Sequence, residues 1–381
     1  MHRRLFENYC SSDLDVQPSE AITPNPEQSV AGGTVGKLHA DDRIEVSSEQ
    51  AILTAKALFI AAGTTPEVAE EVAKHLVEAD QSGVESHGIV RVLQYTREML
   101  DGTLNTGAKP EIKKSDSGRL IVDARGSIGI PAMRMAHQLA AENAIDRGIS
   151  AVAVLGAGHT GRLGAFGEIA AEKGCLSIAI GGGNRKRWRM VAPYRGRTAL
   201  LPTNPYCIAM PGGERGPVVI DIATSQAAGG WIYAARAAGV ELPDGLIVNR
   251  DGEPTRNPED YFDGGAILPK GGPLGYGLAL IAELIGEAML GPVLAGEINW
   301  LVLALDCRRY NTSPSMQIAA EEILSEIRSS APAKGHDVVE VPGERERNLF
   351  ADSQNQPLRI PRRIWGAIEV LASELDVNTH Q

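Results

Sequence analysis

The chain has 381 residues, which is enough for two or three domains with a substantial buried core. Its formal net charge of −11 argues against binding to a nucleic acid backbone, and its 43% hydrophobic and 22% charged residues are ordinary for a soluble globular protein. The four cysteines form no C-x-x-C pair, so we expect neither a metal site nor a disulfide framework, which fits a reducing cytoplasm.

The N-terminal part of the chain predicts a flexible arm followed by helices. Residues 1–46 are rich in Ser, Glu, Gln, Pro and Gly and lack the apolar core of a signal peptide. Ser47 followed three residues later by Gln50 resembles a capping box, and Thr65-Pro66 is typical of an N-cap and first helical residue. The expected helices run from Ser48 to about Ala62, from Pro66 with Val68, Val72, Leu76 and Ala79 on one face, and from near Gly88 with Ile89, Val92, Leu93, Thr96 and Leu100 facing inward.

Ser86, His87 and Arg91 combine side chains that suit chemistry on a small 2-oxo or 2-imino acid. If a helix begins near Gly88, His87 and Arg91 project from one face of its first turn. Arginine grips a carboxylate bidentately, and a histidine nearby delivers a proton to the carbonyl oxygen or imine nitrogen. We expect the positive end of the helix to hold the histidine near its switching range, with Ser86 capping the turn or orienting the ring. The alternative is an ordinary helix start with an N-cap and two solvated side chains.

From residue 119 strands and helices alternate, which predicts an α/β unit between helical chain ends. The expected strands are 119–124, 150–155, 176–180, 216–224 and 298–306, and the expected helices are 131–147, 162–173, 316–328 and 361–374. The apolar segment 278–296 contains two glutamates and Pro292, which are costly in lipid. It therefore predicts a buried helix ending at Gly291-Pro292 and no membrane span.

Gly156, Gly158 and Gly161 form a G-x-G-x-x-G pattern between an expected strand and an expected helix, which is typical of a dinucleotide-binding turn. The acidic residue that should follow about 20 positions later is missing. The chain has instead a glycine run and the basic segment 185–189, which fits either an NADP 2′-phosphate or a solvated loop. The other interpretation is that this loop serves to place His159.

Short motifs are spread along the chain. They are "AD..G..SHG..R" at 79–91, "GHTG" at 158–161, "TNP" at 203–205, "D.AT" at 221–224, "LP.GG..GYGLAL" at 268–280 and "VPGERE" at 341–346. Together they resemble the malate/L-lactate dehydrogenase family of the non-Rossmann kind, from about Ser47 to Val377. The first and fifth motifs are specific, and the others support them.

The resemblance implies an α/β fold with a non-Rossmann mixed-sheet nicotinamide-binding domain, residues 119–309. A helical domain for substrate binding and dimerisation is built from both chain ends, residues 47–118 and 310–381. The resemblance also implies NAD or NADP as cofactor, a small carboxylic-acid substrate, and a homodimer whose active site lies near the subunit interface.

The resemblance assigns roles to individual residues as well. His87 is the proton donor assisted by Ser86, and His159 is a second candidate for the catalytic base. Arg91 and Thr203 hold the substrate. The implied cofactor site consists of His159, Thr160, Gly161, Arg162, Leu163, Asp221, Ile222, Ala223 and Gly275.

Several residues depart from the family pattern. Leu274 stands where a cofactor-site lysine is usual, and Trp231 stands where some members carry an aspartate. Pro202, Arg195 and Asn257 also differ from the usual residues. Two hypotheses follow. The first is an NAD(P)-dependent oxidoreductase that transfers a hydride between nicotinamide and C2 of a small 2-hydroxy/2-oxo acid or cyclic 2-imino acid, with residues 185–189 or Arg195 replacing the lysine. The alternative is a divergent paralogue with lost or altered catalysis that acts as a binding or accessory protein.

Overall fold

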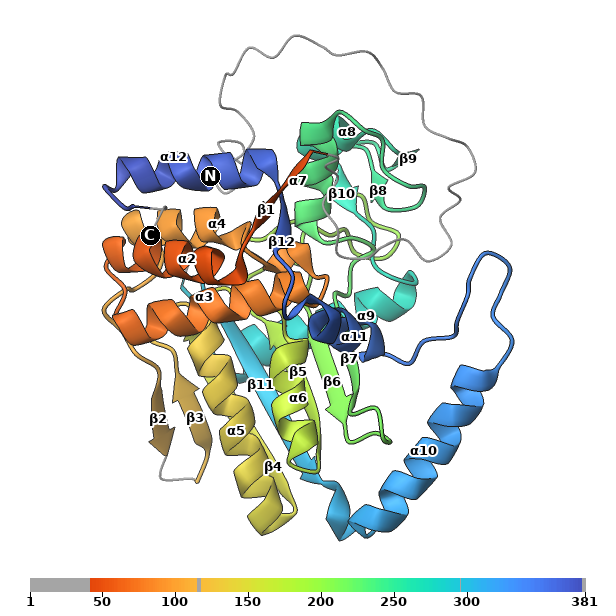
Figure 1. The fold of residues 1–381 in the computed structure, drawn as a ribbon. Helices are drawn as coiled ribbons and strands as arrows, with labels where there is room; N and C mark the ends of the chain where they lie inside the picture. The colour runs from red at the N-terminus through yellow and green to blue at the C-terminus, as the bar shows by residue number, and fades with distance from the viewer. Residues whose placement is uncertain (1–41, 115–117, 295, 379–381) are drawn as a thin grey trace.

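The centre of the molecule is a seven-stranded mixed sheet (Figure 1). The computed structural model describes residues 42–114, 118–294 and 296–378. The strands, in order across the sheet, are β2 (Glu111–Lys114), β3 (Leu120–Asp123), β4 (Ile149–Ala157), β11 (Ile298–Asp306), β5 (Cys175–Gly182), β6 (Tyr206–Met210) and β7 (Val218–Ile222). In this sheet β3 and β4 run parallel, and the other neighbouring pairs are antiparallel. The predicted mixed α/β fold is confirmed, and a parallel Rossmann sheet is excluded.

Two helices cover one face of this sheet, α5 (Gly129–Arg147) and α6 (Gly164–Glu172) (Figure 1). On α5 the fully buried side chains include alanines at four-residue intervals: Ala132, Ala136, Ala140 and Ala144. Residues four apart share a face of a helix, and a face of small side chains lets the helix approach the strands closely. The helix ends at Gly148, whose φ of +95° is unfavourable for other residues.

A helical layer lies across one end of the sheet. It consists of α2 (Ser48–Ala61), α3 (Pro66–Gln81), α4 (Arg91–Leu100) and α12 (Arg362–Glu374). The predicted cap of α2 is confirmed, because Ser47 Oγ accepts from the Gln50 N–H at 3.1 Å. Of the predicted arm, residues 43–46 form strand β1 (Arg43–Val46), which pairs antiparallel with β12 (Leu358–Pro361) and so joins the two chain ends. Residues 1–41 of the arm lie outside the described residues.

A smaller unit with its own hydrophobic core lies beside the helical layer (Figure 1). Its elements are α7 (Gly229–Ala238), α8 (Pro258–Phe262) and the three-stranded sheet β10 (Ala266–Ile267), β8 (Ile247–Val248) and β9 (Pro254–Thr255). Ile232, Leu242 and Ile247 are fully buried in it. This unit faces the end of the main sheet, where the cavity described below opens.

The segment predicted as one buried helix at 278–296 differs in the structure. Helix α9 (Pro273–Glu283) continues into a π-helical turn, η2 (Leu284–Met289). The prediction of burial is wrong for one face, since Ile281 and Leu284 are each 51% exposed. The remaining C-terminal elements are the 3₁₀ turn η3 (Cys307–Arg309), α10 (Ser313–Ser329) and α11 (Glu344–Ser353), the last of which was not predicted. No helix in the described part of the chain is long and apolar enough to cross a membrane.

Candidate functional site

One large cavity, of about 890 Å³, lies between the end of the main sheet, the helical layer and the smaller unit. Its walls come from the turn before α4, from the loops after β4 and β5, from β7 and from the start of α7. The predicted site residues that line it are Ser86, His87, Arg91, His159, Thr160, Gly161, Arg162, Leu163, Thr203, Asp221, Ile222 and Ala223. The structure therefore brings together motifs that are far apart in the chain.

Gly275 is the predicted site residue that does not line this cavity. It lies in the first turn of α9, where its N–H donates to the Lys270 carbonyl at 2.8 Å. A Cβ at this position would approach the Thr224 carbonyl oxygen to 2.4 Å, so only glycine fits. Its glycine is explained by close packing against the chain that follows β7.

Ser86 and His87 lie in a 3₁₀ turn, η1 (Glu85–His87), that precedes α4. The turn is anchored by buried Asp80, whose Oδ2 accepts from the Ile89 N–H at 2.7 Å. A Cβ on Gly88 would lie 2.0 Å from Asp80 Oδ1, which explains the glycine after His87. Helix α4 begins at Arg91, so the predicted start near Gly88 was early by one short turn.

Arg91 lines the cavity and is held both by η1 and by its own helix. Its Nε donates to the Ser86 carbonyl at 2.7 Å, and its Nη1 donates to Gln94 Oε1 at 2.6 Å. Its Nη2 faces the start of α7, because a Cβ on Gly230 would lie 4.0 Å from it. The guanidinium is thus preorganised to receive a carboxylate between α4 and α7.

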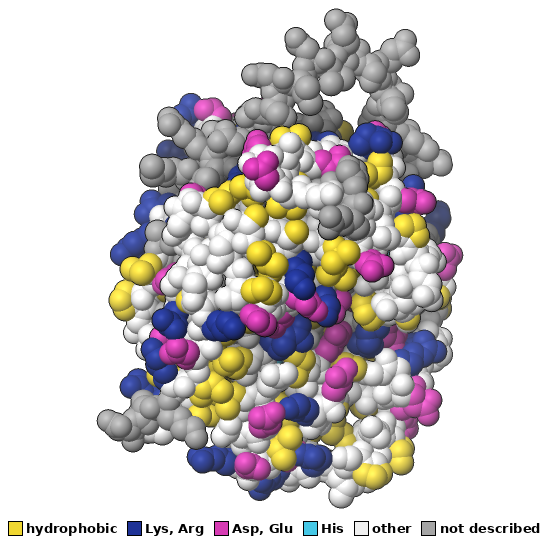
Figure 2. Space-filling model, turned by 60° about the vertical axis from the view of Figure 1, so that its left-hand side comes forward, with side chains coloured by type: hydrophobic (Ala, Val, Ile, Leu, Met, Phe, Trp, Pro, Cys, Tyr) yellow, Lys and Arg dark blue, Asp and Glu magenta, His cyan; other side chains and the backbone are white. Residues whose placement is uncertain are grey.

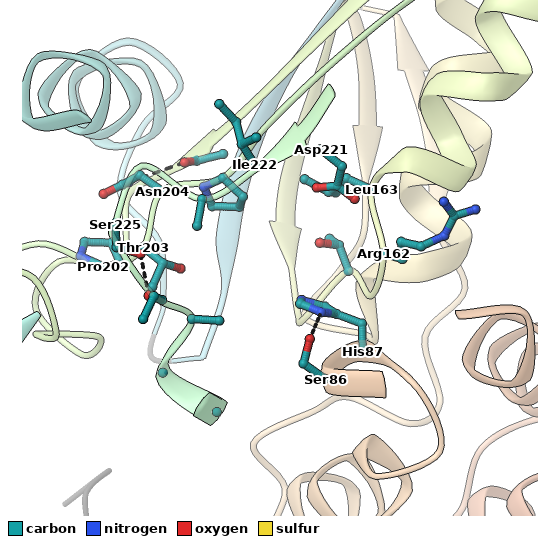
Figure 3. A pocket seen from close by; sticks show the side chains of 18 of the residues that line it. Ser86, His87, Arg162, Leu163, Pro202, Thr203, Asn204, Asp221, Ile222 and Ser225 are labelled. Atoms are coloured by element: carbon teal, nitrogen blue, oxygen red, sulfur yellow. Dashed lines mark hydrogen bonds between the residues drawn. The ribbon is translucent and has the colours of Figure 1, made fainter. Parts of the chain in front are cut away.

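His87 and His159 lie face to face, with ring centroids 5.6 Å apart. The Oγ of Ser86 lies 2.9 Å from His87 Nδ1, as drawn in Figure 3. His159 Nδ1 accepts from the Gly161 N–H at 3.2 Å and lies 2.6 Å from the Tyr95 hydroxyl. An Nδ1 that accepts from a backbone N–H carries no proton, so the neutral ring of His159 carries its proton on Nε2.

Both histidines are held neutral. Burial, with the charges of Arg91 and Arg162, lowers the pKa of His87 to about 3. Burial, with the charge of Arg91, holds the pKa of His159 well below its usual range. The expectation that a helix end keeps His87 near its switching range therefore differs from the structure, because burial is the larger effect.

The loop 158–163 and Asp221 form one wall of the cavity, and Pro202, Thr203 and Asn204 lie across from it (Figure 3). Asp221 Oδ2 accepts from the Gly164 N–H at 2.7 Å, which ties the start of α6 to β7. The Thr203 carbonyl accepts from the Thr224 N–H and hydroxyl, both at 2.9 Å. The bonds of Asp221 and Thr224 thus attach both walls of the cavity to the C-terminal end of β7 and the residues that follow it.

A buried polar network behind Thr203 was missed by the sequence reasoning. Asn204 adopts a φ of +36° and its Nδ2 donates to Glu283 Oε1 at 2.6 Å. Glu283 also accepts from the Gly183 and Arg185 N–H groups, at 3.0 and 3.2 Å. The Oδ1 of Asn204 is buried without a partner among the described residues. Tyr95 was missed too, although its position four residues after Arg91 places both on one helix face.

The departures from the family pattern fall in different places. Trp231 and Pro202 line the cavity, whereas Leu274, Arg195 and Asn257 do not. Leu274 is 67% exposed, and Asn257 caps α8 by accepting from the Glu259 N–H. Within the basic segment Arg185 pairs with Glu287 at 2.9 Å, while Arg187 and Arg189 line the cavity. Among the described residues no group of His, Cys, Asp and Glu side chains is placed to hold a metal ion.

Comparison with known proteins identifies the family of this chain. Residues 46–369 match the malate/L-lactate dehydrogenase family. The chain belongs to this family. The L-sulfolactate dehydrogenase of Methanocaldococcus jannaschii is 32% identical over 83% of this chain and 93% of that protein. The Δ1-pyrroline-2-carboxylate/Δ1-piperideine-2-carboxylate reductase of Pseudomonas syringae pv. tomato is 34% identical over 69% of this chain and 76% of that protein.

Solved structures of the malate/L-lactate dehydrogenase family share the fold. A putative malate/lactate dehydrogenase from E. coli superposes with a TM-score of 0.81 at 27% identity, covering 88% of this chain and 96% of that one. The malate dehydrogenase of Entamoeba histolytica superposes with a TM-score of 0.81 at 21% identity, over 88% and 99% of the two chains, and supports the fold alone. The named relatives are dehydrogenases and reductases, so the family supports an oxidoreductase.

Proposed function

We propose that this chain is an NAD(P)-dependent oxidoreductase that transfers a hydride between nicotinamide and C2 of a small 2-hydroxy/2-oxo acid or cyclic 2-imino acid. The observation that carries the proposal is the stacked His87–His159 pair beside Arg91 in one large cavity. A proton carrier, a hydrogen-bond donor and a carboxylate clamp are what C2 chemistry on such an acid needs from a protein.

The residues present fit a nicotinamide cofactor. The cavity is within the range for ligand sites and larger than a small acid needs. Its wall includes the main chain of the glycine-containing loop 158–163, and the buried Asn204 Oδ1 has an unused acceptor position suited to an amide N–H. The cofactor would be held by this loop and by Asp221, Ile222 and Ala223, and would supply or accept the hydride.

The protein's own groups divide the remaining work. Arg91 binds the substrate carboxylate, with Thr203 across the cavity as a second contact. His87 carries the proton to or from the substrate oxygen or nitrogen, and the Ser86 hydroxyl at 2.9 Å orients its ring. His159 presents its Nε2 proton as a hydrogen-bond donor, because two neighbours engage its Nδ1. The proposal thus gives the two histidines different roles.

The test is a titration of the full-length protein into NADPH and NADH, followed by fluorescence, with turnover then measured on 2-oxo acids, a 2-oxo dicarboxylate and cyclic 2-imino acids. Saturable cofactor binding, and turnover that His87→Gln lowers, are the expected results. Binding of neither cofactor would contradict the proposal and leave the accessory-protein alternative. The titration also decides between NADP and NAD, for which the cavity-lining Arg187 and Arg189 offer positive charge.

We also propose that the chain forms a homodimer, with residues 47–118 and 310–381 as the helical substrate and dimerisation domain and residues 119–309 as the cofactor domain. An apolar stripe on α9 and η2 supports an interface between copies. Its members are about half exposed or more: Leu274, Leu280, Ile281, Leu284 and Met289. Monomeric proteins rarely leave such a stripe uncovered. Light scattering should give twice the chain mass, and Ile281→Glu should shift it to the monomer, whereas a wild-type monomer would contradict the proposal.

A further inference from the structure

His75 lies one layer behind the cavity wall and has no part in the chemistry proposed above. It is on α3, is 1% exposed and does not line the cavity. Its Nε2 accepts a hydrogen bond from the Arg162 N–H at 3.0 Å. Its ring stacks on Phe166 of α6, with centroids 5.0 Å apart and an angle of 6° between the planes. This histidine therefore connects the helical layer to the loop that forms the cavity wall.

The bond from the Arg162 N–H determines which nitrogen of the His75 ring carries the proton. Nε2 accepts from a backbone N–H, so the proton of the neutral imidazole is on Nδ1, which is buried without a partner among the described residues. Burial, with the charges of Arg162 and Arg134, lowers the pKa of His75 to about 3. The ring thus remains neutral, and Nε2 remains an acceptor, across the physiological range. A buried donor left unsatisfied is costly, which indicates that the position is needed for the loop.

The loop packs closely against this ring. Gly161 adopts a φ of +69°, and a Cβ there would lie 2.3 Å from His75 Nε2. On the other side of the loop, Asp221 Oδ2 accepts from the Gly164 N–H at 2.7 Å. The main chain between Gly161 and Gly164 is therefore held between α3 and β7. Arg162 and Leu163, which line the cavity, lie in this held segment.

We propose that His75 is a positioning residue for the nicotinamide cofactor, which places the loop 158–163 by accepting the Arg162 N–H. The proposal rests on the proposed function, because it assigns His75 to the binding of that cofactor. Without the acceptor, the Arg162 N–H is buried and unpaired, so the loop is expected to rotate toward water and leave its cofactor-binding geometry.

His137 provides a matched control, because it contacts the same aromatic ring. It is fully buried on α5, and its ring lies 5.9 Å from Phe166. Its Nδ1 lies 2.9 Å from the Met133 carbonyl of its own helix, so its hydrogen bond stays within α5. Replacing His137 by Phe likewise puts an apolar ring beside Phe166, but leaves the Arg162 N–H paired with His75.

The experiment measures cofactor dissociation constants by calorimetry, and kcat at saturating cofactor, for His75→Phe, His75→Gln, His75→Asn and His137→Phe. The oxygen of glutamine occupies about the place of Nε2, whereas that of asparagine falls near Nδ1 and cannot reach Arg162. We expect His75→Phe and His75→Asn to weaken cofactor binding about tenfold or more with kcat little changed. We expect His75→Gln to restore binding to within about threefold, and His137→Phe to bind as wild type.

Two results would overturn this assignment. One is wild-type cofactor affinity in His75→Phe and His75→Asn, and the other is an equal loss in His137→Phe, which would indicate core packing alone. If the phenylalanine variant does not fold, the contrast between the two amides decides the question. Binding of neither cofactor by the wild-type protein would instead overturn the proposed function, and this assignment with it.

Discussion

The two cavity histidines differ in what surrounds each ring. His159 has two neighbours at Nδ1, the Gly161 N–H and the Tyr95 hydroxyl, which restrict it to one tautomer. Among the described residues His87 has one hydrogen-bonding partner, the Ser86 hydroxyl, which can donate or accept. A group that takes up and releases a proton needs this freedom, which supports the proposal that His87 carries the proton and His159 donates a hydrogen bond.

The low pKa of His87 predicts the pH dependence of the oxidative direction. A base must be deprotonated in the free enzyme, and His87, with a pKa of about 3, is neutral at any pH above this value. We therefore expect kcat/KM for oxidation of a 2-hydroxy acid to be flat from about pH 5 to 8, and to be lost as the pH falls toward 3. A protonation limb near pH 6.5 that disappears in His87→Gln would contradict the lowered pKa.

Tyr95 is expected to act through His159. Tyr95→Phe keeps the buried ring and removes the hydroxyl that lies 2.6 Å from His159 Nδ1. Loss of one buried hydrogen bond costs about 1 kcal/mol, so kcat/KM should fall roughly tenfold or less, and the free energy of unfolding should fall by no more than in a variant that loses a comparable bond outside the cavity. Tyr206→Phe is the control, because it removes a bond to the Leu278 carbonyl outside the cavity. Equal losses of kcat/KM in both variants would contradict the role of Tyr95.

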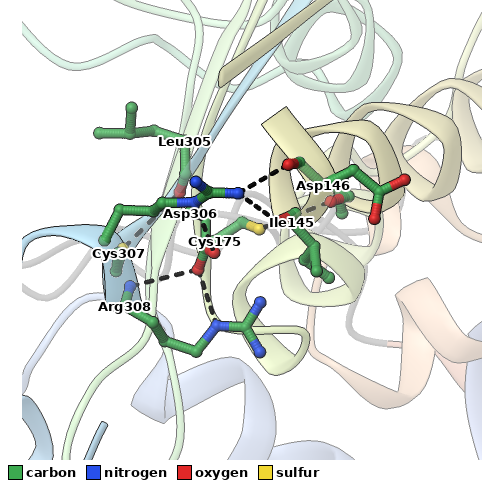
Figure 4. A network of polar contacts seen from close by, with 9 residues as sticks. Ile145, Asp146, Cys175, Leu305, Asp306, Cys307 and Arg308 are labelled. Carbon is green, nitrogen blue, oxygen red and sulfur yellow. Dashed lines mark hydrogen bonds and ion pairs between the residues drawn. The ribbon is translucent and has the colours of Figure 1, made fainter. Parts of the chain in front are cut away.

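At the scale of elements, the C-terminus of α5 is capped by a side chain from η3, the turn that follows β11. Figure 4 shows Ile145 and Asp146 of α5 beside Asp306, the last residue of β11. Arg309 Nη2 donates to the carbonyls of Ile145 and Asp146, at 3.0 and 2.7 Å. Asp306 holds the turn that presents it, since its Oδ1 accepts from the Arg308 N–H at 3.2 Å. A cation at a helix C-terminus satisfies carbonyls that the helix leaves unpaired and meets the negative end of its dipole.

Removal of this cap should lower stability measurably. We expect Arg309→Ala to reduce the free energy of unfolding by about 1 kcal/mol, as measured in urea. Lys173→Ala is the control, because its exposed ion pair with Glu142 at 2.8 Å should contribute about 0.5 kcal/mol or less. If the two variants lose the same amount, Arg309 is only another surface charge.

Elements with a local signal were predictable from the sequence. The strand at 298–306 and the cap at Ser47 match the structure because a short apolar run and a capping residue are signals carried by a few neighbouring residues. The strand order was not predictable, since β11 enters between β4 and β5 from a distant part of the chain. Likewise Leu100 was expected inside but is 50% exposed, because tertiary packing decides which face of α4 is covered.

The candidate site likewise combines residues with a local sequence signal and contacts that depend on the fold. The motifs containing His87 and His159 were visible, but their stacking depends on two loops that only the fold brings together. Asn204 belongs to the TNP motif at 203–205, but its buried partner Glu283 lies 79 positions away in the sequence. His75 gave no signal at all, because an apolar helix face with one histidine predicts core packing.

At the scale of the whole molecule, buried histidines make stability depend on pH. Burial lowers the pKa of His137 to about 4, against about 6.5 in an unfolded chain. Between these values the unfolded state binds more protons, so stability falls as the pH drops through this window, by about 1.4 kcal/mol per pH unit. Buried carboxyls such as Glu98, whose pKa is raised by burial, act in the opposite direction.

His137→Phe isolates this contribution, because the carboxyls and the other histidines remain. We expect the wild-type free energy of unfolding to fall more steeply than that of the variant between pH 6.5 and about 4, by about 1.4 kcal/mol per pH unit. Urea denaturation at several pH values measures both slopes. Parallel curves would show that His137 is protonated equally in the folded and unfolded chains.

The position of β11 in the sheet determines the order in which the protein can be completed during synthesis. Strands β4 and β5 are made early but are not bonded to each other, and each pairs with β11, which ends at residue 306. Strand β1 can pair only after β12, residues 358–361, has been synthesised. Until then the nascent chain carries open strand edges, which are prone to aggregation. Most of the chain must therefore be synthesised before β11 joins the two halves of the sheet that supports the cavity, and a chain stopped before residue 298 is left with an open sheet.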